Sequence, residues 1–163
     1  MIKLLRVDDR LIHGQVAVVW TAFLHADTIV VANDAAANDA FTSMALNLAK
    51  PPGVALNIMT IDTAIKYCSD PSNEAKKIFI VVDTTKDALA VVKGVKGIPS
   101  AILGGMRKSG DKKLIDRQVF VDAQDIENCK AITELGVPVS VHIVPQEKSI
   151  SLQETEKIFE KAK

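Results

Sequence analysis

Short apolar runs alternate with amphipathic stretches along the whole chain. Runs rich in Val, Ile and Leu are typical of buried strands, and they occupy residues 2–7, 28–32, 54–59, 78–82, 98–103, 119–121 and 137–144. Between them, apolar residues recur at helical spacing, which predicts helices over 15–24, 39–49, 61–68, 85–92, 123–135 and from 151 onward. Strands that alternate with helices form parallel sheets covered on both faces. The pattern predicts an α/β fold in a single domain, residues 1–163, with a mainly parallel sheet and one antiparallel edge strand.

Local residue types refine the boundaries of these elements. Gly104 and Gly105 are expected to end the fifth strand, and residues 108–113, which are polar and basic, are expected to form a loop. Ser151 begins the last helix, with Glu154 at the position that completes a capping box.

Composition narrows the class of partner. The chain has 163 residues, 48% of them hydrophobic, and its 20 Lys and Arg balance its 20 Asp and Glu. A net charge of zero gives no electrostatic reason to expect nucleic acid or an anionic membrane surface as the main partner. The two cysteines, Cys68 and Cys129, form no CxxC pair, and no apolar run approaches the roughly 20 residues of a membrane-spanning helix. We therefore expect a soluble, cytoplasmic protein, and a homodimer would be the commonest assembly.

Polar residues follow the carboxyl ends of several predicted strands. They occupy the connectors 8–15, 33–34, 83–84 and 104–108. In an open parallel sheet these connectors meet at one edge, where ligands bind. We therefore expect the functional site to lie there.

The first connector contains the densest group of charged and reactive side chains. Asp8, Asp9, Arg10 and His13 fall within six residues, directly before a predicted helix. The first turn of a helix has unpaired N–H groups and a positive dipole, which favour an anion. Histidine can act as a nucleophile, a phosphoryl group on it would be stabilised by an arginine, and Gly14 would allow close approach to the backbone. The connector is suited to phosphoryl transfer through a phosphohistidine.

Other common chemistries lack their motifs. The chain has no Walker sequence, no GxGxxG after its first strand and no GxSxG elbow. The other histidines, His25 and His142, are not at zinc-ligand spacing from His13. We expect neither a metal nor a cofactor.

The sequence Asp-Asp-Arg-Leu-Ile-His-Gly-Gln-Val at 8–16 resembles the B components of the mannose/fructose/sorbose family of the bacterial sugar phosphotransferase system. Further similarities run along the chain, at 31–34, 39, 51–53, 103–107, 135–139 and 144–145. In that family, the A component passes a phosphoryl group from its own histidine to the B component. The B component passes it on to a sugar that the membrane components C and D translocate.

The resemblance implies specific roles for residues. His13 matches the phosphorylated histidine, with the ring nitrogen nearer the backbone as the attachment point, and Asp8 and Arg10 match the charged residues of that loop. It also implies a cytoplasmic protein that associates peripherally with the inner face of the membrane through C and D. Together with the connector positions, it predicts a substrate-binding set of Gly14, Gln15, Asn33, Asp34, Gly104, Gly105, Met106 and Arg107.

Less specific interpretations compete with these roles. Asn33 and Asp34 are also ordinary turn formers. Paired aspartates after a first strand are found in receiver domains phosphorylated on aspartate, so Asp8 and Asp9 keep that alternative open. The receiver interpretation, however, gives no role to His13 and Gly14. A third alternative is a subunit that binds a small anion without covalent modification.

Overall fold

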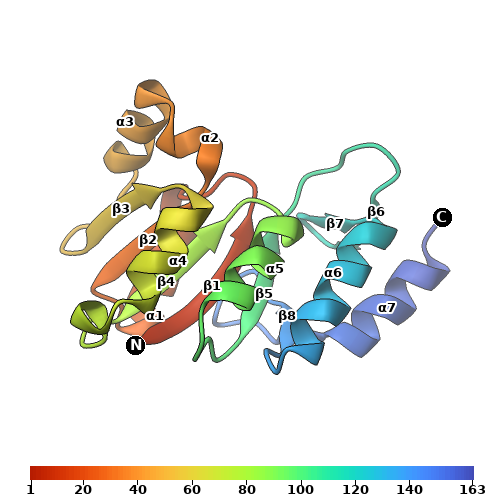
Figure 1. The fold of residues 1–163 in the computed structure, drawn as a ribbon. Coiled ribbons are helices and arrows are strands. Elements are labelled where there is room, and N and C mark those ends of the chain that lie inside the picture. The colour runs from red at the N-terminus through yellow and green to blue at the C-terminus, as the bar shows by residue number, and fades with distance from the viewer.

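The computed structural model describes residues 1–163 and contains a seven-stranded sheet with helices on both faces (Figure 1). The strand order is β3-β2-β4-β1-β5-β8-β9, and β6 and β7 form a separate two-stranded sheet. The strands are β1 (Ile2–Asp8), β2 (Thr28–Ala32), β3 (Ala55–Met59), β4 (Ile78–Val82), β5 (Ala101–Gly105), β6 (Lys113–Asp116), β7 (Val119–Val121), β8 (Val139–Val141) and β9 (Ile150–Ser151). The helices are α1 (Gly14–Leu24), α2 (Asp34–Ala37), α3 (Ala40–Leu48), α4 (Ile61–Ser69), α5 (Thr85–Gly94), α6 (Ala123–Glu134) and α7 (Leu152–Lys161), with a 3₁₀ turn at Pro71–Asn73.

The pairing within the large sheet confirms the predicted fold class. β1 lies between β4 and β5 and is parallel to both, and the parallel pairing extends to β2, β3 and β8. β9 alone runs antiparallel, against β8 at the edge. The connector after β1 therefore leaves the middle of the sheet.

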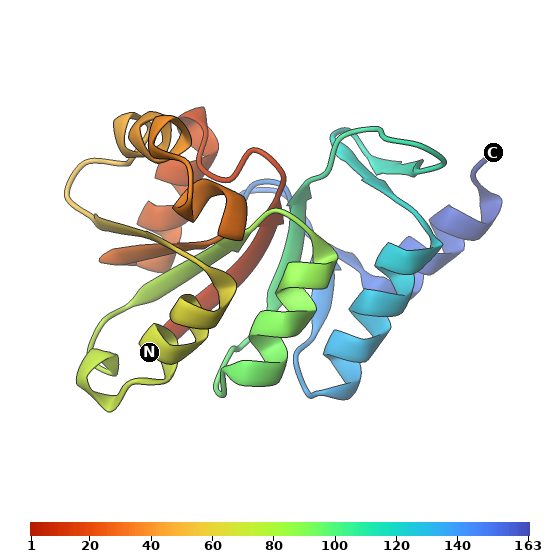
Figure 2. The same cartoon turned by 45° about the horizontal axis from the view of Figure 1, so that its top comes forward.

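The sheet separates two hydrophobic cores. One joins inward-facing residues of α4, α5 and α6 to one face of the central strands. The other joins α1, α2 and α3 to the opposite face, and the two views place these helices on opposite sides (Figures 1 and 2). No helix is long and apolar enough to cross a membrane.

The structure corrects several predicted boundaries. The fifth strand does not stop before Gly104 as predicted, because Gly104 and Gly105 are the last two residues of β5. The last long run, 137–144, is a strand only over its middle three residues, because the chain turns away after β8. The predicted antiparallel edge strand is β9, although the sequence pattern did not show its position, and α2 and β6 were not predicted. The helix predicted over 39–49 is α3, Ala40–Leu48, one residue shorter at each end. Ser151 does cap α7, accepting a hydrogen bond from the N–H of Glu154.

Candidate functional site

The connector between β1 and α1 is a tight turn that ends in His13. The N–H of Leu11 donates to the carbonyl of Asp8 over 2.9 Å, and Leu11 takes a left-handed conformation with φ of 59°. His13 is the N-cap of α1, with extended backbone and no capping hydrogen bond from its side chain. Its imidazole is therefore free to interact elsewhere, at the end of the helix where N–H groups are unpaired.

The imidazole contacts the carboxylate of Asp8. Nε2 of His13 lies 2.9 Å from Oδ2 of Asp8, and Oδ1 of Asp8 accepts from the backbone N–H of Arg10 over 3.1 Å. Asp8 is wholly buried, whereas the side chain of His13 is 22% exposed. The carboxylate thus holds the inner nitrogen of a ring whose other side reaches the surface.

This contact assigns the tautomer of His13. An ionised carboxylate only accepts hydrogen bonds, so the proton of a neutral imidazole lies on Nε2. Nδ1 then keeps its lone pair and makes no hydrogen bond to the protein. The arrangement presents a nucleophilic nitrogen on the backbone side of the ring.

Arg6 holds Asp8 from the other side, and the sequence analysis missed it. Its guanidinium is 2% exposed and donates to Oδ2 of Asp8 through Nη2 over 3.2 Å. Burial lowers the pKa of Arg6 from its ordinary value, and the charge of Asp8 opposes that change. The available signal was an arginine flanked by Leu5 and Val7 in the middle of a predicted buried strand, since a buried charge needs a partner.

Gly104 and Gly105 leave room for these two side chains. A Cβ on Gly104 would lie 2.0 Å from Cζ of Arg6, and one on Gly105 would lie 2.7 Å from Oδ1 of Asp8. Non-bonded contacts of a Cβ atom below 3.0 Å essentially never occur in proteins, so both side chains would have to move. The two glycines therefore belong to the site, as backbone against which Arg6 and Asp8 pack, whereas the sequence analysis predicted substrate contacts.

Arg10, Gly14 and Gln15 flank His13 in the connector and at the start of α1. All three are exposed. The guanidinium of Arg10 makes no hydrogen bond or ion pair within the protein, and the N–H groups of Gly14 and Gln15 belong to the first turn of α1. This exposed part of the turn can receive an anion.

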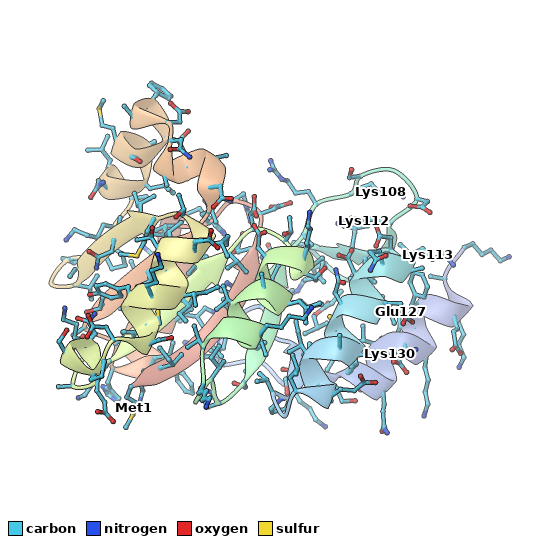
Figure 3. The ribbon with its side chains drawn as sticks, viewed as in Figure 1. Met1, Lys108, Lys112, Lys113, Glu127 and Lys130 are labelled. Carbon is cyan, nitrogen blue, oxygen red and sulfur yellow. The ribbon has the colours of Figure 1, made fainter.

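Beside the turn lies a polar cleft of about 490 Å³, bordered by Asp9 and the segment after β5. Oδ2 of Asp9 accepts from the backbone N–H of Arg107 over 2.8 Å and from its Nε over 3.2 Å. Met106 lines the cleft but is only 3% exposed and packs in the core. Figure 3 shows Lys108 and Lys112 along the loop above α6, where the ammonium of Lys112 lies 3.2 Å from Asp125.

Asn33 and Asp34 follow β2 and cap helices. The side chain of Asn33 accepts from the N–H of Ala36 at the start of α2, over 2.8 Å. Oδ1 of Asp34 accepts from the N–H of Ile61 at the start of α4, also over 2.8 Å. Both residues thus have structural roles at helix starts, and substrate binding by them stays a prediction.

The geometry does not favour a receiver domain. The carboxylates of Asp8 and Asp9, which a receiver domain would offer to Mg²⁺, are already paired with Arg6 and Arg107. Cys68 does not offer a competing nucleophile, because burial of its thiol raises the pKa to about 11. Such a thiol stays protonated and is a poor nucleophile at neutral pH.

Comparisons with known proteins place the chain in a family. Residues 2–163 match the family model of the PTS system sorbose subfamily IIB component. The chain is 36% identical, over 94% of its length and 98% of the relative's, to a probable phosphotransferase enzyme IIB component of Streptococcus pyogenes. It is 30% identical to the mannose-specific EIIAB component of Escherichia coli, covering 94% of this chain and 48% of that longer protein.

Solved structures show the same fold. The IIBSor domain of the sorbose permease from Klebsiella pneumoniae superposes with a TM-score of 0.90, at 30% identity and with 96% of each chain covered. The N-acetylgalactosamine-specific IIB component 1 from Escherichia coli gives a TM-score of 0.85, at 32% identity over 93% of this chain and 99% of that one. With its fold, its histidine turn and its full-length match in agreement, the chain belongs to the sorbose subfamily of IIB components of the phosphotransferase system.

Proposed function

We propose that this chain, acting as one domain over residues 1–163, is a phosphocarrier that accepts a phosphoryl group on Nδ1 of His13. The donor is the phosphohistidine of a IIA component, and the acceptor is a sugar hydroxyl presented by the membrane components IIC and IID. The observation that carries the proposal is the 2.9 Å contact between Asp8 and Nε2 of His13, which leaves Nδ1 as the free nucleophile. A relative that joins IIA and IIB in one chain supports the choice of donor.

The first step exchanges one phosphorus–nitrogen bond for another. The lone pair of Nδ1 of His13 forms a bond to phosphorus while the bond to the donor imidazole breaks, and the donor nitrogen keeps that electron pair. The proton on Nε2 stays in its hydrogen bond to Asp8, which stabilises the positive charge of the phosphorylated ring. Transfer of this kind depends on in-line positioning and on stabilising spread negative charge, for which the first amides of α1 and Arg10 are available.

The second step releases the phosphoryl group to the sugar. The hydroxyl oxygen attacks phosphorus, the bond to Nδ1 breaks and its electron pair returns to the ring, and the hydroxyl proton passes to solvent. His13 is then ready for another donor. Because both partners must reach His13, we propose that the protein works in the cytoplasm, against the inner face of the membrane where IIC and IID lie.

Intact mass after incubation with a phosphorylated IIA component tests the proposal. We expect one added phosphoryl group, labile in acid and stable in alkali, on the wild type and none on His13→Ala. His25→Asn is the matched control, because His25 caps the other end of the same helix in a left-handed conformation that asparagine tolerates. Modification that persists in His13→Ala, or that requires Mg²⁺, would contradict the assignment.

A further inference from the structure

Trp20 makes a polar contact that hydrophobic packing does not explain. It is the only tryptophan of the chain and is 2% exposed on α1. Its indole Nε1 donates to the carbonyl oxygen of Ile143 over 2.8 Å. Packing in the core on the α1 side accounts for the burial of the ring but not for the direction of its N–H.

The same carbonyl oxygen also binds the arginine of the site. Nη1 of Arg6 donates to the carbonyl of Ile143 over 3.1 Å and to that of His142 over 3.2 Å. The opposite edge of the guanidinium binds Asp8. One backbone oxygen is thus shared between Trp20 and Arg6.

The shared oxygen lies just beyond the last residue of β8, where sheet pairing ends. The N–H of His142 still donates to the carbonyl of Leu103, over 3.0 Å, but the residues from Ile143 to Ser149 belong to no strand. The indole N–H ties this segment to α1, the helix that begins directly after His13. The Trp20 ring also packs edge-on against the ring of His142, with centroids 4.9 Å apart, but only its N–H holds the carbonyl oxygen that orients Arg6.

We propose that the indole N–H of Trp20 is a positioning group for His13, acting through the carbonyl of Ile143, Arg6 and Asp8. The inference rests on the proposed function of His13 as phosphoryl acceptor. The links from Trp20 to Asp8 are buried hydrogen bonds or ion pairs, and the link from Asp8 to His13 is partly buried. The indole N–H acts by fixing the position of the carbonyl oxygen that Arg6 binds. Loosening the carbonyl lets the guanidinium shift, which weakens the hold of Asp8 on Nε2 of His13.

Two changes at Trp20 separate the effect of the N–H donor from the effect of the aromatic ring. Trp20→Phe keeps an aromatic ring and removes the donor. Because the chain has a single tryptophan, replacing the indole with benzothiophene during expression changes only this position and preserves the shape of the ring. The isostere keeps the test decisive if Trp20→Phe fails to fold.

Thr21→Val is the matched control. Thr21 is the next residue of α1 and is 5% exposed, and its hydroxyl donates to the carbonyl of Ala17 over 2.6 Å. The substitution also removes one buried side-chain hydrogen bond, but one that does not lead to the site. It therefore reports the cost of a merely structural loss.

The experiment measures the tautomer of His13 by nitrogen NMR of the imidazoles, and the rate of phosphoryl transfer from phosphorylated IIA. His13→Gln identifies the His13 signals. In the wild type and in Thr21→Val, we expect the proton on Nε2 alone. In both Trp20 changes we expect a mixture of tautomers and a transfer rate about tenfold lower at saturating donor, the size of losing one buried hydrogen bond, with the half-saturating donor concentration unchanged.

Trp20 is only a packing residue if the isostere keeps the wild-type tautomer, or if its transfer rate equals that of Thr21→Val. The NMR comparison needs no donor, so it decides the positioning role even if the wild type accepts no phosphoryl group. If the wild type accepts no phosphoryl group, the proposed function is overturned, but the link between Trp20 and the imidazole is not.

Discussion

At the scale of single residues, the site depends on the missing side chain of Gly104. We expect Gly104→Ala to slow phosphoryl transfer by at least tenfold, because its Cβ would lie 2.0 Å from Cζ of Arg6 and would displace the guanidinium from Asp8. Displacing a buried charge from its partner costs about 3–5 kcal/mol, so unfolding free energy should fall as well. Transfer kinetics and urea denaturation measure the two effects.

A double-mutant cycle with Arg6→Ala separates a specific clash from general damage. If Gly104→Ala acts through the guanidinium, it should change the transfer rate little once Arg6 is absent, because coupled residues are not additive. Additive losses would show that the methyl group acts elsewhere.

His13, Asp8 and the turn that joins them were predictable because their chemistry is concentrated in a few consecutive residues. Arg6 and Trp20 were not predicted as parts of the site, and Gly104 and Gly105 were predicted there as substrate contacts, not as backbone against which Arg6 and Asp8 pack. Their contacts join β1, β5, α1 and the segment after β8, so they depend on strand order and register, which periodicity does not specify. Gly104 and Gly105 suggested a break because glycine usually interrupts strands, whereas here it marks the close approach of a neighbouring side chain.

At the scale of elements, the start of α5 carries a carboxyl that opposes folding at neutral pH. The pKa of Asp87 rises from 3.8 to about 6 through partial burial, then through a hydrogen bond with Asp83 and the charges of Asp83 and Asp34. The folded state therefore binds more protons than the unfolded state between those values, and stability falls as pH rises across this window. We expect a loss of about 1 kcal/mol from this group, because a half-exposed carboxyl is screened by solvent.

Urea denaturation between pH 3.5 and 7 measures how the unfolding free energy changes with pH. Asp87→Asn removes the titrating group and should make the unfolding free energy less dependent on pH between 4 and 6. Asp62→Asn removes a carboxylate from the first turn of α4 and controls for the helix dipole. An unchanged slope in Asp87→Asn would assign the pH dependence to other groups.

Elements were predictable where an apolar run or an apolar helical pattern extended over several residues, as in β2, β4 and α5. α2 has four residues, and its start was interpreted as a turn, although an asparagine before an Asp-Ala-Ala-Ala run is also a helix N-cap pattern. β9 has two residues and exists because it pairs with β8. Elements this short are set by tertiary contacts and carry little periodicity of their own.

At the scale of the whole molecule, the two cores should unfold together, because the same central strands build both. Phe79 and Ile80 are neighbours on β4, with 1% and 0% exposure, and they pack in the opposite cores. Truncating either to alanine should cost about 2–5 kcal/mol through lost burial and the cavity left behind. A strand cannot leave one core while it remains ordered in the other, so we expect one transition in each variant.

The single tryptophan makes this expectation measurable. Trp20 reports the core on the α1 side, whereas far-ultraviolet circular dichroism reports all helices. In Ile80→Ala, which damages the core on the other side, the fluorescence midpoint in urea should fall as far as the circular dichroism midpoint. If Trp20 kept its wild-type midpoint while the ellipticity fell, the α1 side would be stable on its own. Cooperative unfolding would also mean that the strength of the opposite core limits how firmly the strands hold Arg6 and Asp8 beneath His13.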